Sequence, residues 1–316
     1  MTVLIVSASY DIAADYVSRV LGSTGVVHFR LNTDKFPVEV RAAFDPSRGF
    51  TLSDGGDEVD SRHVTAVWYR RHVSPELPED LEEGVREFCE RESRAFLGGI
   101  LETLRGARWL SPPSAIALAE KKPYQLSVAS ELGFEIPTTL MTNDPGAVLR
   151  FGSSSSLVAK AVSSGYIRSK EGNRGIFTSR VGEGDLEDLG GLTLAPVTFQ
   201  EFVDKAADIR VTVIGSDVFA AEILSQSDES SRVDWRATDD PNLEHRRHEL
   251  PSAIRQRCVE LVRRLGLSFG AIDLALRKDG NYVFFEINPN GEWVWIEDQL
   301  GYPISQSIAV WLTGKG

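Results

Sequence analysis

The sequence predicts an α/β protein, in which short strands alternate with amphipathic helices. An apolar run at residues 3–6 is followed by a helical pattern to about Leu21 and a second strand candidate at residues 26–31. This order of strand, helix and strand is typical of a parallel arrangement. Near the other end, two alternating segments flank Asp279-Gly280, which is a strong signal for a β-hairpin.

The first 110 residues are expected to form a Rossmann-like domain. After the two opening strands, residues 40–60 resemble a small hairpin region and residues 65–69 form a further strand. Apolar spacing between residues 79 and 105 indicates one or two amphipathic helices. The chain lacks a G-x-G-x-x-G motif after its first strand, so dinucleotide binding has little support there. Ser111-Pro112-Pro113 then breaks the pattern and marks the first predicted boundary.

The remaining chain is predicted to form two further domains, at residues 111–195 and 196–316. A helix is expected at residues 114–132, ended by Gly133, and strands at residues 136–140 and 157–162. A polar segment at residues 163–175 leads into a returning strand at residues 175–178, and the last helix is expected at residues 304–312. The sequence therefore predicts three domains.

Composition excludes several classes of protein. The 316 residues carry a formal net charge of −12, which argues against a general nucleic-acid binder because such proteins neutralise phosphates. Cys89 and Cys258 lie far apart and form no disulfide framework, which fits a reducing compartment. The start has no basic region before its apolar run, and no stretch approaches the length of a membrane span. We therefore expect a soluble cytoplasmic protein that binds neither nucleic acid nor membrane.

The hairpin around Asp279-Gly280 carries the most informative side chains. If these two residues form the turn, Asp273 lies opposite Glu286, and Asn288 faces Ala271 on the same side of the ribbon. The other face is then a core face of residues 272, 274 and 276 against residues 283, 285 and 287. Two opposed carboxylates repel each other, and a bound hard cation such as Mg²⁺ explains the pair better than a solvated face does.

If the metal carries nucleotide phosphates, cationic side chains are expected to come from elsewhere in the chain. Lys160 lies in an otherwise apolar strand, where it is either a phosphate ligand or an edge-strand lysine. The polar segment that follows supplies small residues and three cations, and it suits a mobile flap over phosphates. It is not a P-loop, because G-x-x-x-x-G-K-[ST] is absent from the sequence.

These residues together resemble the motifs of ATP-grasp ligases. The motifs are Lys122, Lys160, Gln200-Glu201-Phe202-Val203, Asp208 and the hairpin with Asp273, Glu286 and Asn288. Within that superfamily the chain is similar to the graspetide synthetases, the microviridin-type maturases of ribosomal peptides. The stretches behind this likeness are Trp68-Tyr69-Arg70-Arg71, residues 119–126, residues 137–144, Asp234-Trp235-Arg236 and residues 288–297. The resemblance covers nearly the whole chain and implies an ATP-grasp fold with an N-terminal Rossmann-like pre-ATP-grasp domain.

The resemblance also implies roles for the residues. Lys122 and Lys160 would hold the phosphates of ATP, residues 201–203 with Gln200 would form the adenine-contacting hinge, and Asp208 would bind the ribose. Asp273, Glu286 and Asn288 would coordinate Mg²⁺. Lys121 stands beside Lys122 where relatives often carry an uncharged polar residue, and we favour Lys122 as the inward lysine because it precedes Pro123.

The activity implied is ATP-dependent cyclisation of a ribosomal precursor peptide. A carboxylate of the peptide becomes an acyl phosphate, and a Thr or Ser hydroxyl or a Lys amine attacks it to give an ester or amide. Such chemistry needs positioning and charge neutralisation more than a protein nucleophile. Arg210 and Arg236 are candidates for holding the acidic side chain or the acyl phosphate; the alternative for each is a surface ion pair.

Two other readings stay open at this point. A RimK-like ligase would add amino acids to a small molecule or protein tail, and a non-catalytic ATP-binding module would keep the fold without the reaction. The expected partner is a precursor peptide with a leader and an acidic core, and the resemblance makes a homodimer the expected assembly.

Three further groups have simpler interpretations. His245 to His248 lacks the HExxH order, so we expect a solvated loop or helix end and no zinc. Trp293 and Trp295, on a strand-like segment, are expected to pack. The segment Arg70-Arg71-His72 is expected either to bind an acidic peptide or to end a strand.

Overall fold

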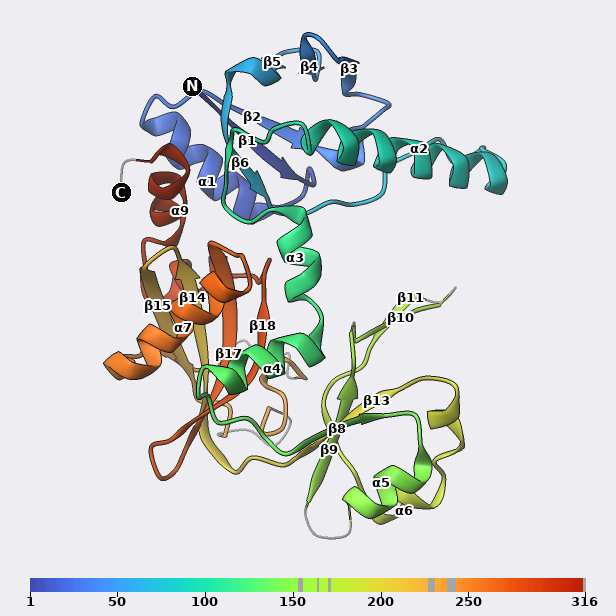
Figure 1. Ribbon diagram of the computed structural model, residues 1–316, viewed down its shortest axis with the longest axis vertical. Coiled ribbons are helices and arrows are strands. Elements are labelled where there is room, and N and C mark those ends of the chain that lie inside the picture. The colour runs from blue at the N-terminus through green and yellow to red at the C-terminus, as the bar shows by residue number, and fades with distance from the viewer. Residues whose placement is uncertain (153–155, 164, 170–171, 227–230, 238–242, 315–316) are drawn as a thin grey trace. The chain divides into compact units, whose positions relative to one another are not determined.

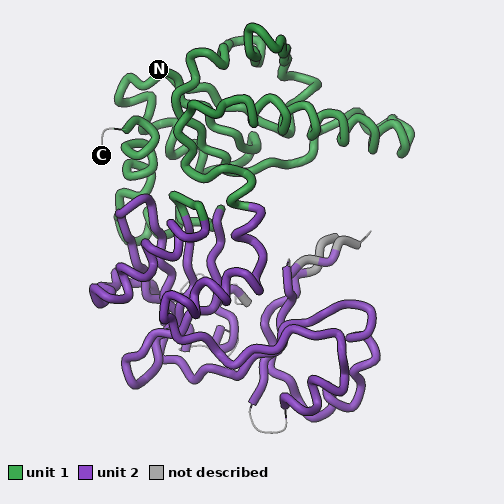
Figure 2. The backbone as a smooth tube through the Cα atoms, in the orientation of Figure 1, with its two compact units in different colours: residues 1–116, 266–269, 290–316 green, residues 117–265, 270–289 purple. Residues whose placement is uncertain are grey.

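The chain forms two compact units in a computed structural model (Figures 1 and 2). The structure describes residues 1–152, 156–163, 165–169, 172–226, 231–237 and 243–314. Unit 1 comprises residues 1–116, 266–269 and 290–316, and unit 2 comprises residues 117–265 and 270–289. The division into three domains at residues 110 and 195 stays a prediction.

Unit 1 is built around a parallel sheet with the strand order β2-β1-β6-β7. Its strands are β1 (Thr2–Ser7), β2 (His28–Asn32), β6 (Val64–Tyr69) and β7 (Arg108–Trp109). Its helices are α1 (Ile12–Ser23), α2 (Glu83–Leu101), α8 (Val294–Leu300) and α9 (Ile304–Thr313), and α3 (Pro113–Ala119) leads into unit 2. The side chain of Asp11 accepts a hydrogen bond from the backbone N–H of Ala13 and so caps α1. The elements β1, α1 and β2 form a parallel strand–helix–strand unit, which confirms the predicted Rossmann-like opening.

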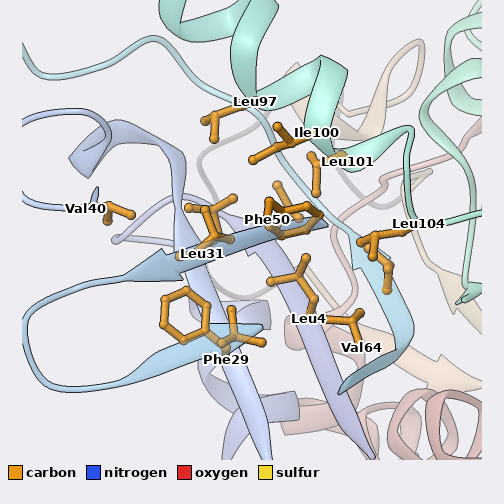
Figure 3. Packing of buried hydrophobic residues seen from close by; sticks show 14 of the residues in the cluster. Leu4, Phe29, Leu31, Val40, Phe50, Val64, Leu97, Ile100, Leu101 and Leu104 are labelled. Carbon is orange, nitrogen blue, oxygen red and sulfur yellow. The ribbon is translucent and has the colours of Figure 1, made fainter. Parts of the chain in front are cut away.

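The core of unit 1 lies between this sheet and α2. Leu4, Leu31 and Leu97 are buried there together with Phe50, as Figure 3 shows. Phe50 comes from a small antiparallel sheet of β3 (Arg41–Asp45), β4 (Gly49–Ser53) and β5 (Glu58–Asp60), which replaces the predicted hairpin. Burial of these alternating apolar side chains is what holds the small sheet on the larger one.

Unit 2 contains a four-stranded antiparallel sheet in the order β12-β9-β13-β8. The strands are β8 (Thr139–Thr142), β9 (Leu157–Ala161), β12 (Ser179–Arg180) and β13 (Val197–Glu201), with helices α5 (Pro145–Phe151) and α6 (Glu183–Glu187). Val148, Leu192 and Phe199 form its small core. A separate hairpin consists of β10 (Tyr166–Ser169) and β11 (Gly172–Gly175).

The second sheet of unit 2 has five strands in the order β16-β15-β14-β17-β18. They are β14 (Lys205–Ile214), β15 (Asp217–Ile223), β16 (His245–Arg247), β17 (Phe269–Arg277) and β18 (Tyr282–Asn288). Helices α4 (Lys122–Glu131) and α7 (Ser252–Arg264) belong to the same part of the unit (Figure 1). The strand β18 lies at the edge of this sheet and contacts α4.

Proline explains where two predicted elements differ from the structure. The helix expected at residues 114–132 is interrupted after Ala119 and starts again at Lys122, with Pro123 in its first turn. Proline has no N–H to donate and its ring clashes with the preceding turn, so it fits a helix start and breaks a helix interior. The strand expected at residues 136–140 begins instead at Thr139, after Pro137.

The hairpin of β17 and β18 has the predicted register at one end and a different turn at the other. Asp273 pairs with Glu286 and Ala271 with Asn288, as predicted, but Leu276 pairs with Tyr282. The loop therefore has three residues rather than the predicted two. Its last residue, Gly280, has a φ of 87°. A bulge at Phe285 absorbs the extra residue.

Candidate functional site

A pocket in unit 2 gathers most of the predicted site residues. Those that line it are Lys160, Gln200, Glu201, Phe202, Val203, Asp208, Arg236, Asp273 and Glu286. They come from β9, β13, β14, β17 and β18, from the loop between β13 and β14, and from the short 3-10 helix Trp235–Ala237. Three predicted residues, Lys122, Arg210 and Asn288, do not line the pocket but contact Glu286 or Asp273 directly.

The two opposed carboxylates and the amide of Asn288 converge on one point. The Nδ2 atom of Asn288 lies 3.4 Å from Oδ2 of Asp273 and 3.4 Å from Oε1 of Glu286. Asp273 and Glu286 are both buried. The solvated face considered above is therefore wrong for this pair, since buried carboxylates require cationic partners or a metal.

Cationic side chains surround Glu286. The ammonium of Lys122 forms a salt bridge with Oε2, and a guanidinium nitrogen of Arg236 lies 3.3 Å from Oε1. Burial alone would favour the protonated form, but Lys122, Lys160 and Arg236 outweigh it and hold the pKa of Glu286 well below its usual range. Lys121 is exposed, so Lys122 is the lysine that faces this carboxylate.

Asp273 is held by a different cation. The Nη1 atom of Arg210 lies 2.9 and 2.8 Å from the two carboxylate oxygens, and both side chains are buried. Arg210 is thus in a buried ion pair and not in the surface pair considered as an alternative. Removing one partner of a buried ion pair lowers the stability of a protein by several kcal/mol. The two hydrogen bonds from Arg210 hold the carboxylate of Asp273 in position.

Lys160 reaches the pocket from β9 and lies near the ring of Phe285, with its ammonium 6.0 Å from the ring centre. Burial lowers its pKa to about 8, with the nearby Lys122 and Arg236 acting in the same direction and Glu286 against it. The bulge at Phe285 explains this contact. It turns Phe285 from the predicted core face to the pocket, whereas Phe284 is fully buried against Phe134.

Residues 200–203 line the pocket where β13 ends and the loop to β14 begins. The backbone N–H of Glu201 donates to the carbonyl of Thr138, and that of Phe202 donates to Ser156. The side chain of Gln200 is buried and donates to Oγ1 of Thr139 at 2.9 Å. This segment is therefore held by backbone hydrogen bonds on both sides.

Asp208 lines the pocket but is already paired. Its carboxylate accepts hydrogen bonds from the ammonium of Lys205 at 2.7–2.8 Å and from the hydroxyl of Ser225 at 2.5 Å. Burial raises its pKa in spite of these partners. Sequence reasoning missed Lys205, and the signal available was its spacing of three residues before Asp208.

Asp234 was also missed as a positioning residue, although it lies in the motif Asp234-Trp235-Arg236. Its buried carboxylate accepts hydrogen bonds from the backbone and hydroxyl of Thr178 at 3.3 and 3.2 Å. It also accepts from Nε and Nη2 of Arg236 at 2.9 and 3.0 Å. Asp234 therefore orients the guanidinium that reaches Glu286.

The donor set fits a small hard cation. Two carboxylates and an amide converge, and Mg²⁺ takes one or two carboxylates while phosphates and waters complete its shell. The described residues contain no cluster of three His, Cys, Asp or Glu side chains that could hold a metal. That finding is compatible with this site, because its third predicted ligand is an asparagine.

The remaining sequence candidates have structural explanations. The side chain of Arg70 is buried and contacts Asp11 and Glu292 within unit 1. His245–Arg247 is a strand and not a loop or helix end, and His248 contacts Glu222 and the hydroxyl of Tyr282. Trp293 is fully buried, as predicted, but residues 294–300 form a helix and not a strand.

Part of the predicted flap lies outside the described residues, namely residues 164, 170 and 171. Among the described helices, none combines the length and the apolar character needed to cross a membrane.

Comparison with known proteins identifies the family. Residues 2–117 match the model of the MvdD pre-ATP grasp domain. The macrocyclase MdnC of Microcystis aeruginosa MRC, crystallised with precursor peptide MdnA, is 35% identical, with a TM-score of 0.89, over 99% of this chain and 100% of that one. The macrocyclase MdnB of the same organism is 36% identical, with a TM-score of 0.80, over 98% of each chain.

A third relative was crystallised with a nucleotide. It is the RiPP-associated ATP-grasp ligase of Chryseobacterium gregarium, in complex with ADP and a leader and core peptide. It is 32% identical, with a TM-score of 0.92, over 100% of this chain and 97% of that one. The comparison with curated proteins gave no match. With a matching pre-ATP-grasp domain and full-length relatives above 30% identity, this chain belongs to the graspetide-type ATP-grasp ligases, the peptide macrocyclases of RiPP maturation.

Proposed function

We propose that this enzyme activates Asp or Glu side chains of a ribosomal precursor peptide with ATP and joins them to Thr or Ser hydroxyls or Lys amines. The observation that carries the proposal is the meeting of Lys122, Lys160 and Arg236 around Glu286, next to Asp273. A concentration of positive charge beside two carboxylates suits the binding of a metal–nucleotide complex and an acidic substrate.

The proposed cofactors are ATP and Mg²⁺. Asp273, Glu286 and Asn288 would hold the metal, which would supply neutralisation of phosphate charge. Lys122 and Lys160 would hold phosphate oxygens. Gln200 and residues 201–203 would contact the adenine, and Asp208, with Lys205 as its partner, would meet the ribose.

The chain's own residues position reactants and neutralise charge. The substrate carboxylate attacks the γ-phosphorus, the bond to ADP breaks, and an acyl phosphate forms. The hydroxyl or amine then attacks the acyl carbon, and phosphate leaves while the nucleophile loses its proton. Arg236, held by Asp234, would bind the acidic side chain or the acyl phosphate. Arg210 is proposed for the same task, although the structure places it on Asp273.

The proposed partner is a peptide with a leader and an acidic core. Relatives of this chain were crystallised with precursor, leader and core peptides. Exposed apolar side chains in unit 2 offer a surface for an amphipathic leader. The side chains meant here are Ile167 on β10 and, after β11, Ile176 and Phe177, which are among those exposed in unit 2. A homodimer and a cytoplasmic location stay predictions from the sequence.

The test is to incubate the enzyme with ATP, Mg²⁺ and a candidate precursor peptide and to record the mass of the peptide. Loss of one water per crosslink, dependent on ATP, supports the proposal. An unchanged mass, with ATP hydrolysed only when free amino acids are added, would contradict it and favour a RimK-like ligase. An Asp273→Ala variant that keeps full ligation activity would refute the metal assignment.

A further inference from the structure

The side chain of Gln125 bonds to the backbone of β18 between two predicted metal ligands. Its Nε2 donates to the carbonyl of Ile287 at 2.8 Å, and its Oε1 accepts from the N–H of Ile287 at 3.1 Å. The same Nε2 also donates to the carbonyl of Ala119 at 2.6 Å. Gln125 is 3% exposed, so these bonds are made away from solvent.

The strand β18 needs such a partner at this position. It is the edge strand of its sheet, and Ile287 pairs with Ile272 on one side only. The outward N–H and C=O of an edge residue are unpaired unless another group supplies them with a donor and an acceptor. A glutamine amide carries one of each, so it takes the place of a neighbouring strand at a single residue.

The same side chain connects the two parts of the charged site. Gln125 lies one helical turn after Lys122, the first residue of α4, and Ile287 lies between Glu286 and Asn288 in sequence. Lys122 contacts Glu286. The amide of Gln125 therefore fixes the helix that carries the lysine to the backbone that carries the carboxylate and the asparagine.

A second attachment joins the segment that follows α4 to β18. The backbone N–H of Phe284 donates to the carbonyl of Glu135 at 2.8 Å, and the rings of Phe134 and Phe284 lie 5.5 Å apart. Phe134 does not line the pocket. Phe134 thus provides a matched control, because its loss loosens the same contact between segments without touching the backbone at Ile287.

We infer that Gln125 is a positioning residue for catalysis, which sets the distance between Lys122 and the metal-binding residues Glu286 and Asn288. The inference rests on the proposed function for the identity of the metal and the nucleotide. Its geometric part, the fixing of the Ile287 peptide group by Gln125, is independent of that function. Partners that orient metal ligands typically change metal affinity by about 10–100-fold when removed.

The test compares Gln125→Met and Gln125→Glu with Phe134→Leu and the unsubstituted chain. The methionine keeps length and helix propensity but removes both bonding groups, and the glutamate keeps an acceptor while it loses the donor. The readouts are amide hydrogen exchange at Ile287, affinity for ADP with and without Mg²⁺, and unfolding in denaturant. If the methionine variant does not fold, the glutamate variant carries the comparison.

We expect exchange at Ile287 to rise about tenfold or more in Gln125→Met, because a buried hydrogen bond is lost. Both Gln125 variants should lose about tenfold or more of the Mg²⁺-dependent affinity for ADP. Phe134→Leu should unfold more easily but keep that affinity. Equal affinity changes in Phe134→Leu and Gln125→Met, or unchanged affinity in both Gln125 variants, would overturn the inference. Absence of Mg²⁺-dependent ADP binding in the unsubstituted chain would instead overturn the proposed function.

Discussion

Replacing Glu286 with glutamine removes the charge on which the pocket's cations converge. The side chain of Glu286 is 8% exposed, whereas those of Lys122 and Arg236 are 16% and 46% exposed. Removing one member of a buried ion pair costs about 3–5 kcal/mol. Solvent screens the partly exposed Arg236, so we expect a loss at or below the lower end of this range, about 2–3 kcal/mol, in the free energy of unfolding.

The same change should alter nucleotide binding in a specific way. Without Glu286, Lys122 is available for phosphate oxygens, so metal-free ADP should bind more tightly than it does to the unsubstituted chain. Addition of Mg²⁺ should then give little further gain, because one of the two carboxylate ligands is missing.

Calorimetric titration of ADP in chelator and in Mg²⁺ measures both effects. Glu222→Gln is the matched control, since Glu222 is also buried and is paired with Arg246 and His248 outside the pocket. That variant should lose stability and keep the effect of Mg²⁺. If Glu286→Gln retained the full Mg²⁺ enhancement, the metal assignment would be wrong.

Three further predictions concern Lys160, Cys258 and Gly270. With a pKa of about 8, about half of Lys160 is neutral at pH 8 in the metal-free enzyme. An acylating reagent should therefore label Lys160 faster than ordinary lysines, and ADP should protect it. Labelling slower than at exposed lysines, without protection by ADP, would contradict this prediction. Burial raises the pKa of Cys258 to about 12. A thiol reagent at pH 8 should therefore modify the half-buried Cys89 in the native protein, and Cys258 only after unfolding. Equal rates of modification of the two cysteines in the native protein would count against the burial of Cys258. A Cβ at Gly270 would lie 2.6 Å from Cδ1 of Ile287. The substitution Gly270→Val should therefore lower the free energy of unfolding by about 1–3 kcal/mol. An unchanged denaturation midpoint would refute the close packing of Gly270 against Ile287.

The sequence carried enough information for the central pairing of the site. Alternation along residues 269–277 and 282–288 set Asp273 against Glu286, and the structure confirms this register. The pattern could not reveal that the turn has three residues, because a bulge at Phe285 restores the register beyond it. The sequence pattern therefore placed Phe285 on the core face of the hairpin, whereas the structure turns it to the pocket. A bulge cannot be recognised from the alternation of apolar and polar residues alone.

Contacts between distant segments explain what sequence patterns could not supply. Gln125 and Ile287 are 162 residues apart, and Arg210 and Asp273 are 63 apart. Each such partner is chosen by the three-dimensional packing of helices and strands and has no local periodicity. Lys205 and Asp208 are local, but their spacing of three residues is common on surfaces and does not indicate a buried pair in a β-strand.

The most direct test of the account follows the oxygen atoms of the substrate carboxylate. A precursor peptide with ¹⁸O in its Asp and Glu side chains is incubated with the enzyme, ATP and Mg²⁺, and the released phosphate is analysed by mass spectrometry. Activation as an acyl phosphate transfers one labelled oxygen to inorganic phosphate for each crosslink, with one ADP formed. Crosslinked peptide accompanied by unlabelled phosphate, or by AMP in place of ADP, would contradict the central claim.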